Sequence, residues 1–179
     1  MSASPPTFLT VDVRRSGLRF SQRVYIPRIV GTILCALFIS SVLITRPVPT
    51  LLWVLLFLNT FIWPHIAYTL SLRSRDPMQC EKRNLLIDVA FGGIWIGFMG
   101  VNLLPSAVIA AMVGMNCTAG GGVKLLVQGI VLQCVACVLV LVLFSVPVSL
   151  DTTPLQLYAC LPMLLGTRVF WVMSLTPLR

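Results

Sequence analysis

Residues 125–146 read LLVQGIVLQCVACVLVLVLFSV, an apolar run of 22 residues without a charged side chain. A helix needs about 20 such residues to cross the hydrocarbon core of a bilayer. Five further apolar runs occupy residues 29–44, 51–72, 85–101, 104–117 and 155–175. The sequence therefore predicts an all-α, polytopic membrane protein with about six transmembrane helices.

The composition supports this class of protein. Hydrophobic residues make up 58% of the 179 residues and charged residues only 10%, whereas about 25% of a soluble domain is charged. Six spans with short loops use almost the whole chain, which leaves no room for an extramembrane domain of about 100 residues. We therefore expect no catalytic domain within this sequence and do not expect an enzyme.

The charge distribution predicts an orientation. Basic residues are expected on one side of the membrane at ten positions, against Arg46 alone on the other side. The ten are Arg14, Arg15, Arg19, Arg23, Arg28, Arg73, Arg75, Lys82, Arg83 and Lys124. Because short cytoplasmic loops carry the excess of Lys and Arg, both termini are predicted in the cytoplasm, and the protein in a bacterial inner membrane. The net charge of +8 does not indicate nucleic acid, because the basic residues lie between apolar runs.

The first 26 residues are predicted to form a separate basic segment ahead of a membrane domain at 27–175, with a short tail at 176–179. Arg15, Arg19 and Arg23 recur every four residues, so a helix would gather them on one side. With Arg28 they are predicted as the basic residues of the membrane surface. An interfacial helix held by anionic lipid and a loosely ordered topogenic segment both remain open.

Two turns are predicted between apolar runs. The stretch Asn102-Leu103-Leu104-Pro105-Ser106 carries no charge, which favours a tight helical hairpin over one long helix. Gly120-Gly121-Gly122 precedes Lys124. It lacks the pattern of a phosphate-binding loop and is interpreted as a flexible cytoplasmic turn.

Ionisable groups inside spans are costly and are candidates for function by default. His65 lies in the second predicted span and Asp88 in the third, both toward the cytoplasmic side. Glu81, Asn84 and Asp88 share one helix face by their spacing. We predict a polar cluster of these four residues. It could pin helices together, or it could contact a signal.

Other motifs are interpreted mainly as packing features. Pro64, in Trp63-Pro64-His65, predicts a kink in the second span. Small residues that let helices approach closely recur every three or four positions. They are Gly93, Gly97 and Gly100, followed by Ser106, Ala110 and Gly114. They could pack helices within one molecule or form a dimer face.

The cysteines and the single histidine do not predict a redox or metal centre. Cys134 and Cys137 have the CxxC spacing but lie in the middle of an apolar run, which favours packing over thiol chemistry. A membrane thiol oxidoreductase would require both. One histidine without a nearby thiolate falls short of a metal site, and no cofactor is expected.

The residues above resemble the type-2 membrane-associated sensor domain, the six-helix N-terminal module of bacterial diguanylate cyclases and of some class III adenylate cyclases. The resemblance follows the order and spacing of motifs along most of the chain. These are Arg15-Ser16-Gly17-Leu18-Arg19-Phe20, Pro27-Arg28, Trp63-Pro64-His65, Asp76-Pro77, Glu81, Asn84-Leu85, Asp88, Gly93, Trp95, Gly97, Met99-Gly100-Val101-Asn102, Leu104-Pro105-Ser106, Asn116 and Gly120-Gly121. The sequence is similar in these motifs to the cyclases that promote cellulose and curli production.

In that family a connecting helix and a GGDEF or cyclase domain follow the sixth helix, whereas this sequence reaches Arg179 without one. The resemblance therefore implies a sensory and anchoring module without cyclic di-guanylate synthesis of its own, either truncated or acting as a separate protein. It also implies a homodimer or association with an intact cyclase that carries the same module. A small transporter or channel lined by Asn59, Asn84, Asn102 and Asn116 is the alternative, although the two halves show no repeat.

Overall fold

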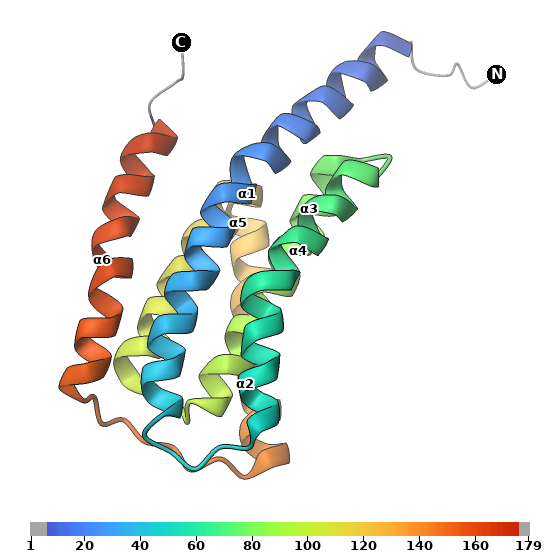
Figure 1. Cartoon of the computed structure of the whole chain (residues 1–179). Coiled ribbons are helices and arrows are strands. Elements are labelled where there is room, and N and C mark those ends of the chain that lie inside the picture. Colours follow the sequence, from blue (N-terminus) through green and yellow to red (C-terminus); the bar gives the residue numbers. More distant parts are fainter. Residues whose placement is uncertain (1–6, 176–179) are drawn as a thin grey trace.

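The computed structural model describes the backbone of residues 7–175 and the side chains of residues 14–165. The described chain is a bundle of helices that run up and down, with α1 beside α6 and α3 beside α4 (Figure 1). The elements are α1 (Thr7–Leu43), α2 (Thr50–Phe57), the π-helix η1 (Leu58–Ile62), α3 (Trp63–Arg73), α4 (Pro77–Phe98), α5 (Leu103–Phe144) and α6 (Pro154–Leu175). Every element within residues 7–175 is helical, so the predicted all-α class is confirmed.

Among the described residues, three stretches are long and apolar enough to cross a membrane by themselves: Arg14–Leu43, Thr50–Arg73 and Leu103–Phe144. The described part of α6 adds a shorter apolar helix, Pro154–Leu165. The helix α4 is not among them, because Glu81, Lys82, Arg83 and Asp88 interrupt its first half.

The predicted boundary at residue 26 does not coincide with the end of a helix. α1 continues from Thr7 through Pro27 to Leu43, and at about 1.5 Å per residue its 37 residues extend some 55 Å. The basic segment thus belongs to the same continuous helix as the first apolar run, and its start leans away from the bundle (Figure 1). The predicted tail, 176–179, lies outside the described residues.

The predicted hairpin is confirmed, but its turn lies at residues 99–102, because residues 103–106 already belong to α5. α4 ends at Phe98, and Gly100 and Val101 take φ values of 64° and 56° before α5 begins at Leu103. Val101 therefore adopts a conformation that is uncommon for a β-branched residue. The α5–α6 connection covers this turn, since Ser149 N donates to Gly100 O at 2.9 Å and Asn102 Nδ2 donates to Asp151 O at 2.5 Å.

The predicted turn at Gly120–Gly122 divides α5 into two arms. Gly122 has φ 66° and ψ −160°, a region that essentially only glycine occupies. The first arm, residues 103–121, and the second arm, residues 123–144, run in opposite directions (Figure 1). The fourth and fifth apolar runs of the sequence are therefore separate passes of the bundle.

The small residues of α4 pack inside the molecule. A Cβ added to Gly93 would collide with the Gln133 carbonyl, and one added to Gly97 would lie 2.7 Å from Val140 Cβ. Both contacts are with the second arm of α5. Gly100 packs against Pro147 and Arg46. In the first arm Ser106 is buried, Gly114 has only an ordinary contact with Leu126, and Ala110 is exposed, so these three do not form one packed face.

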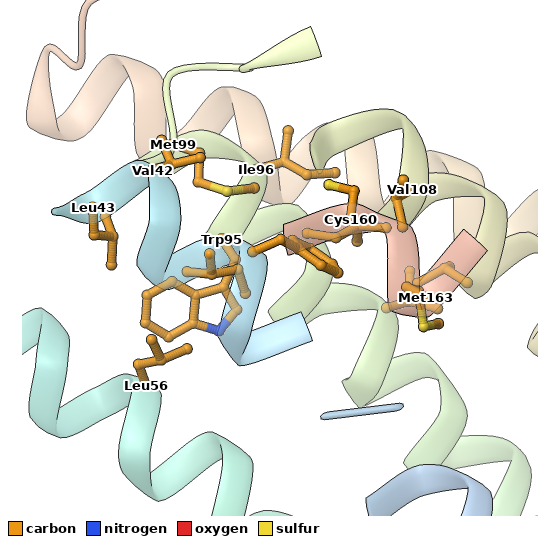
Figure 2. Close-up of a cluster of buried hydrophobic side chains, with 14 of the residues drawn as sticks. Val42, Leu43, Leu56, Trp95, Ile96, Met99, Val108, Cys160 and Met163 are labelled. Atoms are coloured by element: carbon orange, nitrogen blue, oxygen red, sulfur yellow. The ribbon is translucent and has the colours of Figure 1, made fainter. Parts of the chain in front are cut away.

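The apolar core runs along the bundle, from the α4–α5 turn to Leu85, Cys117 and Leu125 near the other end. Figure 2 shows Trp95 of α4 and Met99, which directly follows this helix, among Val42 and Leu43 of α1, Leu56 of α2, and Cys160 and Met163 of α6. Met99 and Leu43 are fully buried, each with 0% of its surface exposed. In the opposite half of the bundle, polar side chains add a second set of contacts between helices.

Candidate functional site

The site begins with the inward face of α1. Gly17, Ser21 and Arg28 are buried on this helix, whereas Arg15, Arg19 and Arg23 are exposed. A Cβ on Gly17 would lie 2.9 Å from Met78 N, so only glycine allows α1 to approach the first turn of α4 this closely. This approach directs Arg28, three turns later, at the side of α4.

Arg28 lies between two carboxylates of α4. Its Nε donates to Asp88 Oδ2 at 2.9 Å, and its Nη2 donates to Glu81 Oε1. Glu81 is fully buried, with 0% of its surface exposed, and Arg28 retains 7%. The two carboxylates are seven residues apart, which is two helical turns, so one guanidinium can bridge them.

The helix α3 supplies the remaining partners. Ser71 Oγ donates to Glu81 Oε2 at 2.6 Å, and Asn84 Nδ2 donates to Ser71 Oγ at 3.0 Å and to Ala67 O at 2.9 Å. Trp63 Nε1 donates to Asp88 Oδ1 at 2.5 Å. We call these six residues the polar network, and it joins α1, α3 and α4. Its members are Arg28, Trp63, Ser71, Glu81, Asn84 and Asp88.

The π-helix η1 precedes the residue that reaches Asp88. Pro64 has no N–H and cannot donate to the Thr60 carbonyl four residues earlier. The Thr32 hydroxyl of α1 lies 3.3 Å from that carbonyl and 3.0 Å from Ile29 O. The predicted kink is therefore a five-residue π turn, Leu58–Ile62, which sets the rotation of α3 and so the direction of Trp63.

His65 does not join the polar network. Its ring is exposed, and its Nδ1 lies 2.8 Å from Tyr25 Oη, while Tyr25 stacks on Tyr68 with ring centroids 4.3 Å apart. His65 is two residues after Trp63, which turns it about 200° away from the side of the helix that faces Asp88. Of the four predicted cluster residues, the structure joins Glu81, Asn84 and Asp88 and places His65 at the seam between α1 and α3.

Arg28 corrects a sequence prediction. It is a buried member of the polar network rather than a residue of the membrane surface. The sequence interpretation grouped it with the other N-terminal arginines, and it also missed Trp63 and Ser71 as partners. The spacing of Gly17, Ser21 and Arg28 contains the missed signal, because it puts the arginine on the same side of the helix as small residues that can contact a neighbour.

The polar network contains one cation and two carboxylates. Removing ionised groups from water costs several kcal/mol for each ion unless pairing and hydrogen bonds offset it, and the cost persists in a membrane. Both carboxylates accept from Arg28 and from a second donor, but Arg28 Nη1 has no hydrogen-bond partner among the described residues. Breaking any one contact therefore leaves a buried charge less well paired, so the network favours one arrangement of the three helices.

The remaining sequence candidates do not converge on this site. Asn102 binds Asp151 O in the α4–α5 turn region, far along α4 from Asn84. All six cysteines are free thiols, with Cys134 exposed and Cys137 half-buried. Among residues whose side chains are described, no group of three or more His, Cys, Asp or Glu could hold a metal ion.

Comparison with known proteins places the site within a known domain. Residues 23–111 match the MASE2 domain, a range that includes every member of the polar network. The chain is 38% identical over 160 residues to the probable diguanylate cyclase DgcC of Escherichia coli K12, and equally to that of the O6:H1 strain CFT073. The match covers 89% of this chain and 43% of each relative.

No solved structure matches the chain. The match to the cyclases is confined to less than half of their length, and the family match lies in the membrane-associated part. The order of motifs, the apolar helices and the two comparisons agree. Residues 23–111 are a MASE2 domain, and the chain is thus a membrane sensor module that corresponds to the N-terminal region of a diguanylate cyclase.

Proposed function

We propose that the chain crosses the bacterial inner membrane six times with both termini in the cytoplasm. The six crossings are α1, α2 with η1 and α3, α4, the two arms of α5, and α6. The start of α1, the α3–α4 turn and the end of α6 lie at one end of the bundle (Figure 1). Exposed basic side chains gather at that end on α1, in the α3–α4 turn and just after Gly122, while Arg46 lies beside Gly100 at the other end.

The thickness of the bundle supports this topology. The exposed side of α1 becomes apolar at Ile26, and from there to Leu43 the helix rises about 26 Å, close to the ~30 Å of a hydrocarbon core. On α3 the exposed side chains change from apolar at Leu70 to basic at Arg73.

Reporter fusions in the loops around residues 47, 75, 101, 122 and 150 test the topology. Cytoplasmic signals at 75 and 122 and external signals at 47, 101 and 150 are expected.

The function that we propose is signal reception and membrane anchoring on behalf of a diguanylate cyclase. The relatives are named as probable diguanylate cyclases, and this chain matches 43% of their length. We assign synthesis of cyclic di-guanylate to the part of those proteins that the chain does not match. The chain would then act on a cyclase through a shared dimer or through association with an intact cyclase of the same kind.

The observation that carries this proposal is the polar network. Simple anchoring needs only apolar helices, whereas this module buries Arg28 and Glu81 between three of them and pairs the arginine also with the half-buried Asp88. Intramembrane ionisable residues are rare and expensive, and they mark functional elements in membrane proteins. Because α1 contacts α3 and α4 through the network and also packs along α6, a rearrangement at Arg28 can reach the helix that leads toward the cyclase domain in the relatives.

A chimera tests the proposal. The present chain replaces the matching region of the Escherichia coli relative, and cyclic di-guanylate is measured in cells that lack other cyclases. The variant Arg28→Leu/Glu81→Gln/Asp88→Asn removes the charges but keeps similar shapes. We expect an altered nucleotide level at equal protein amount, while the exposed control Arg75→Gln leaves the level unchanged. Equal cyclic di-guanylate levels with the unchanged chimera, the triple variant and the control would mean that the module only anchors the cyclase.

A further inference from the structure

One stripe of α1 changes from basic to apolar along its length. Exposed residues follow one another at steps of four, four, three, four, three and four, which keeps them on one side of the helix. They are Arg15, Arg19, Arg23, Ile26, Val30, Ile33 and Leu37. The change from guanidinium to aliphatic side chains falls between Arg23 and Ile26. We call this stripe the outer face of α1.

The outer face is held away from the rest of the protein. On the opposite side Gly17 packs against Pro77 and Met78 of α4, and Arg28 is bound by Glu81 and Asp88. The helix therefore cannot rotate to direct its arginine row inward without losing both contacts. The row is presented outward at the level where the apolar stripe begins.

No described carboxylate neutralises the arginine row. Within residues 14–165, Glu81 and Asp88 are bound by Arg28, Asp76 accepts from Gln79 N at the start of α4, and Asp151 lies near the α4–α5 turn. The side chain of Asp12, one turn before Arg15, lies outside this range, so the argument rests on Arg19 and Arg23. These two lie about 6 Å apart along the axis.

An unpaired pair of arginines directly above a lipid-facing stripe has the chemistry of an anionic phospholipid site. Phosphate accepts from guanidinium groups, and acyl chains fit beside exposed aliphatic side chains. We propose that the outer face of α1 binds an anionic phospholipid, with the headgroup at Arg19 and Arg23 and an acyl chain along Ile26 and Val30. Resting on the proposed function, this makes the lipid an input to the module, because the same helix carries Arg28.

Native mass spectrometry of the purified full chain tests lipid binding directly. The detergent-solubilised protein is titrated with phosphatidylglycerol and, for comparison, with phosphatidylcholine. For Arg19→Gln/Arg23→Gln we expect phosphatidylglycerol to be retained at least about tenfold less than by the unchanged protein. Retention of phosphatidylcholine should change little. The control Arg73→Gln/Arg75→Gln removes the same charge from exposed positions at the same end and should retain phosphatidylglycerol as the unchanged protein does.

Three outcomes would overturn the site. An equal loss in both double variants would mean a response to overall charge, no loss in Arg19→Gln/Arg23→Gln would mean that these arginines do not bind the headgroup, and equal retention of both lipids would mean that only the apolar stripe binds. Thermal melting of both variants controls for folding, which should not change at exposed positions. The cyclase chimera is a separate readout, so lipid binding and the proposed signalling can fail independently.

Discussion

The two halves of α4 pack by opposite means. The first half buries Glu81 and Asn84 and places the half-buried Asp88 against α1 and α3, where hydrogen bonds and ion pairs fix the partners. The second half buries Gly93 and Gly97 against the second arm of α5, where the absence of side chains allows close contact. The glycine half can tolerate no added volume, whereas the polar half depends on matched charges. Only in the polar half could the side chains exchange hydrogen-bond partners and so change how the helices pack.

Added volume in the glycine half should have the largest effect. Gly97→Leu places a branched side chain where a single Cβ would already lie 2.7 Å from Val140 Cβ. We expect a loss of more than about 4 kcal/mol in the free energy of unfolding, or no folded protein. The matched control is Gly114→Ala, whose Cβ would meet only Leu126 Cδ1 at 3.6 Å. Size-exclusion profiles and melting temperatures in detergent compare the two variants. Equal profiles and equal melting temperatures would contradict the claim that Gly97 is packed more tightly than Gly114.

Loss of the cation in the polar half should have the next largest effect. Arg28→Leu leaves the buried Glu81 and the half-buried Asp88 without their shared partner. Breaking a buried ion pair from one side costs about 3–5 kcal/mol, and we expect a destabilisation of that order in mixed-micelle denaturation. The exposed Arg23→Leu on the same helix should change the unfolding free energy by less than about 0.5 kcal/mol. Similar values for both variants would mean that Arg28 does not hold the network together.

Removing one donor should have an intermediate effect. Trp63→Phe keeps the aromatic contact with Phe91 but removes the hydrogen bond to Asp88. We expect a loss of about 1–2 kcal/mol, because the acceptor is a carboxylate that keeps Arg28 as its other partner. If Trp63→Phe in an Asp88→Ala background, which has no acceptor at this position, costs as much as in the unchanged protein, the two side chains are not coupled.

The exposed seam between α1 and α3 should show the smallest effect. Tyr25→Phe removes the hydroxyl that pairs with His65 but keeps the stack on Tyr68. Interhelical hydrogen bonds in membrane proteins average about 0.6 kcal/mol, so we expect a change of that size or less. A loss comparable with that of Arg28→Leu would move the centre of the site from the polar network to His65.

The sequence predicted those elements that depend on local chemistry. The hairpin of α4 and α5 follows from Pro105, which lies close to the boundary between two apolar runs. The division of α5 follows from consecutive glycines, of which Gly122 takes a positive φ. The shared face of Glu81, Asn84 and Asp88 follows from helical spacing. In each case the signal lies within a few residues.

Features that depend on tertiary contacts were missed. Charge counting assigns Arg28 to the membrane surface because it treats all N-terminal arginines alike, and nothing local shows that α1 continues through Pro27 as one helix. His65 was placed with Asp88 because a π turn and its effect on rotation are not visible in a proline motif. The exposure of Ala110 likewise depends on which side of α5 meets α4.

The central claim is that Arg28, Glu81 and Asp88 form one coupled network that holds α1 against α4. Its most direct test compares Arg28→Leu with Arg28→Leu/Glu81→Gln/Asp88→Asn in mixed-micelle unfolding. Neutralising both carboxylates removes the unpaired charges, so the triple variant should regain most of the stability that Arg28→Leu loses. A triple variant no more stable than Arg28→Leu would contradict the claim, since the three charges would then act independently.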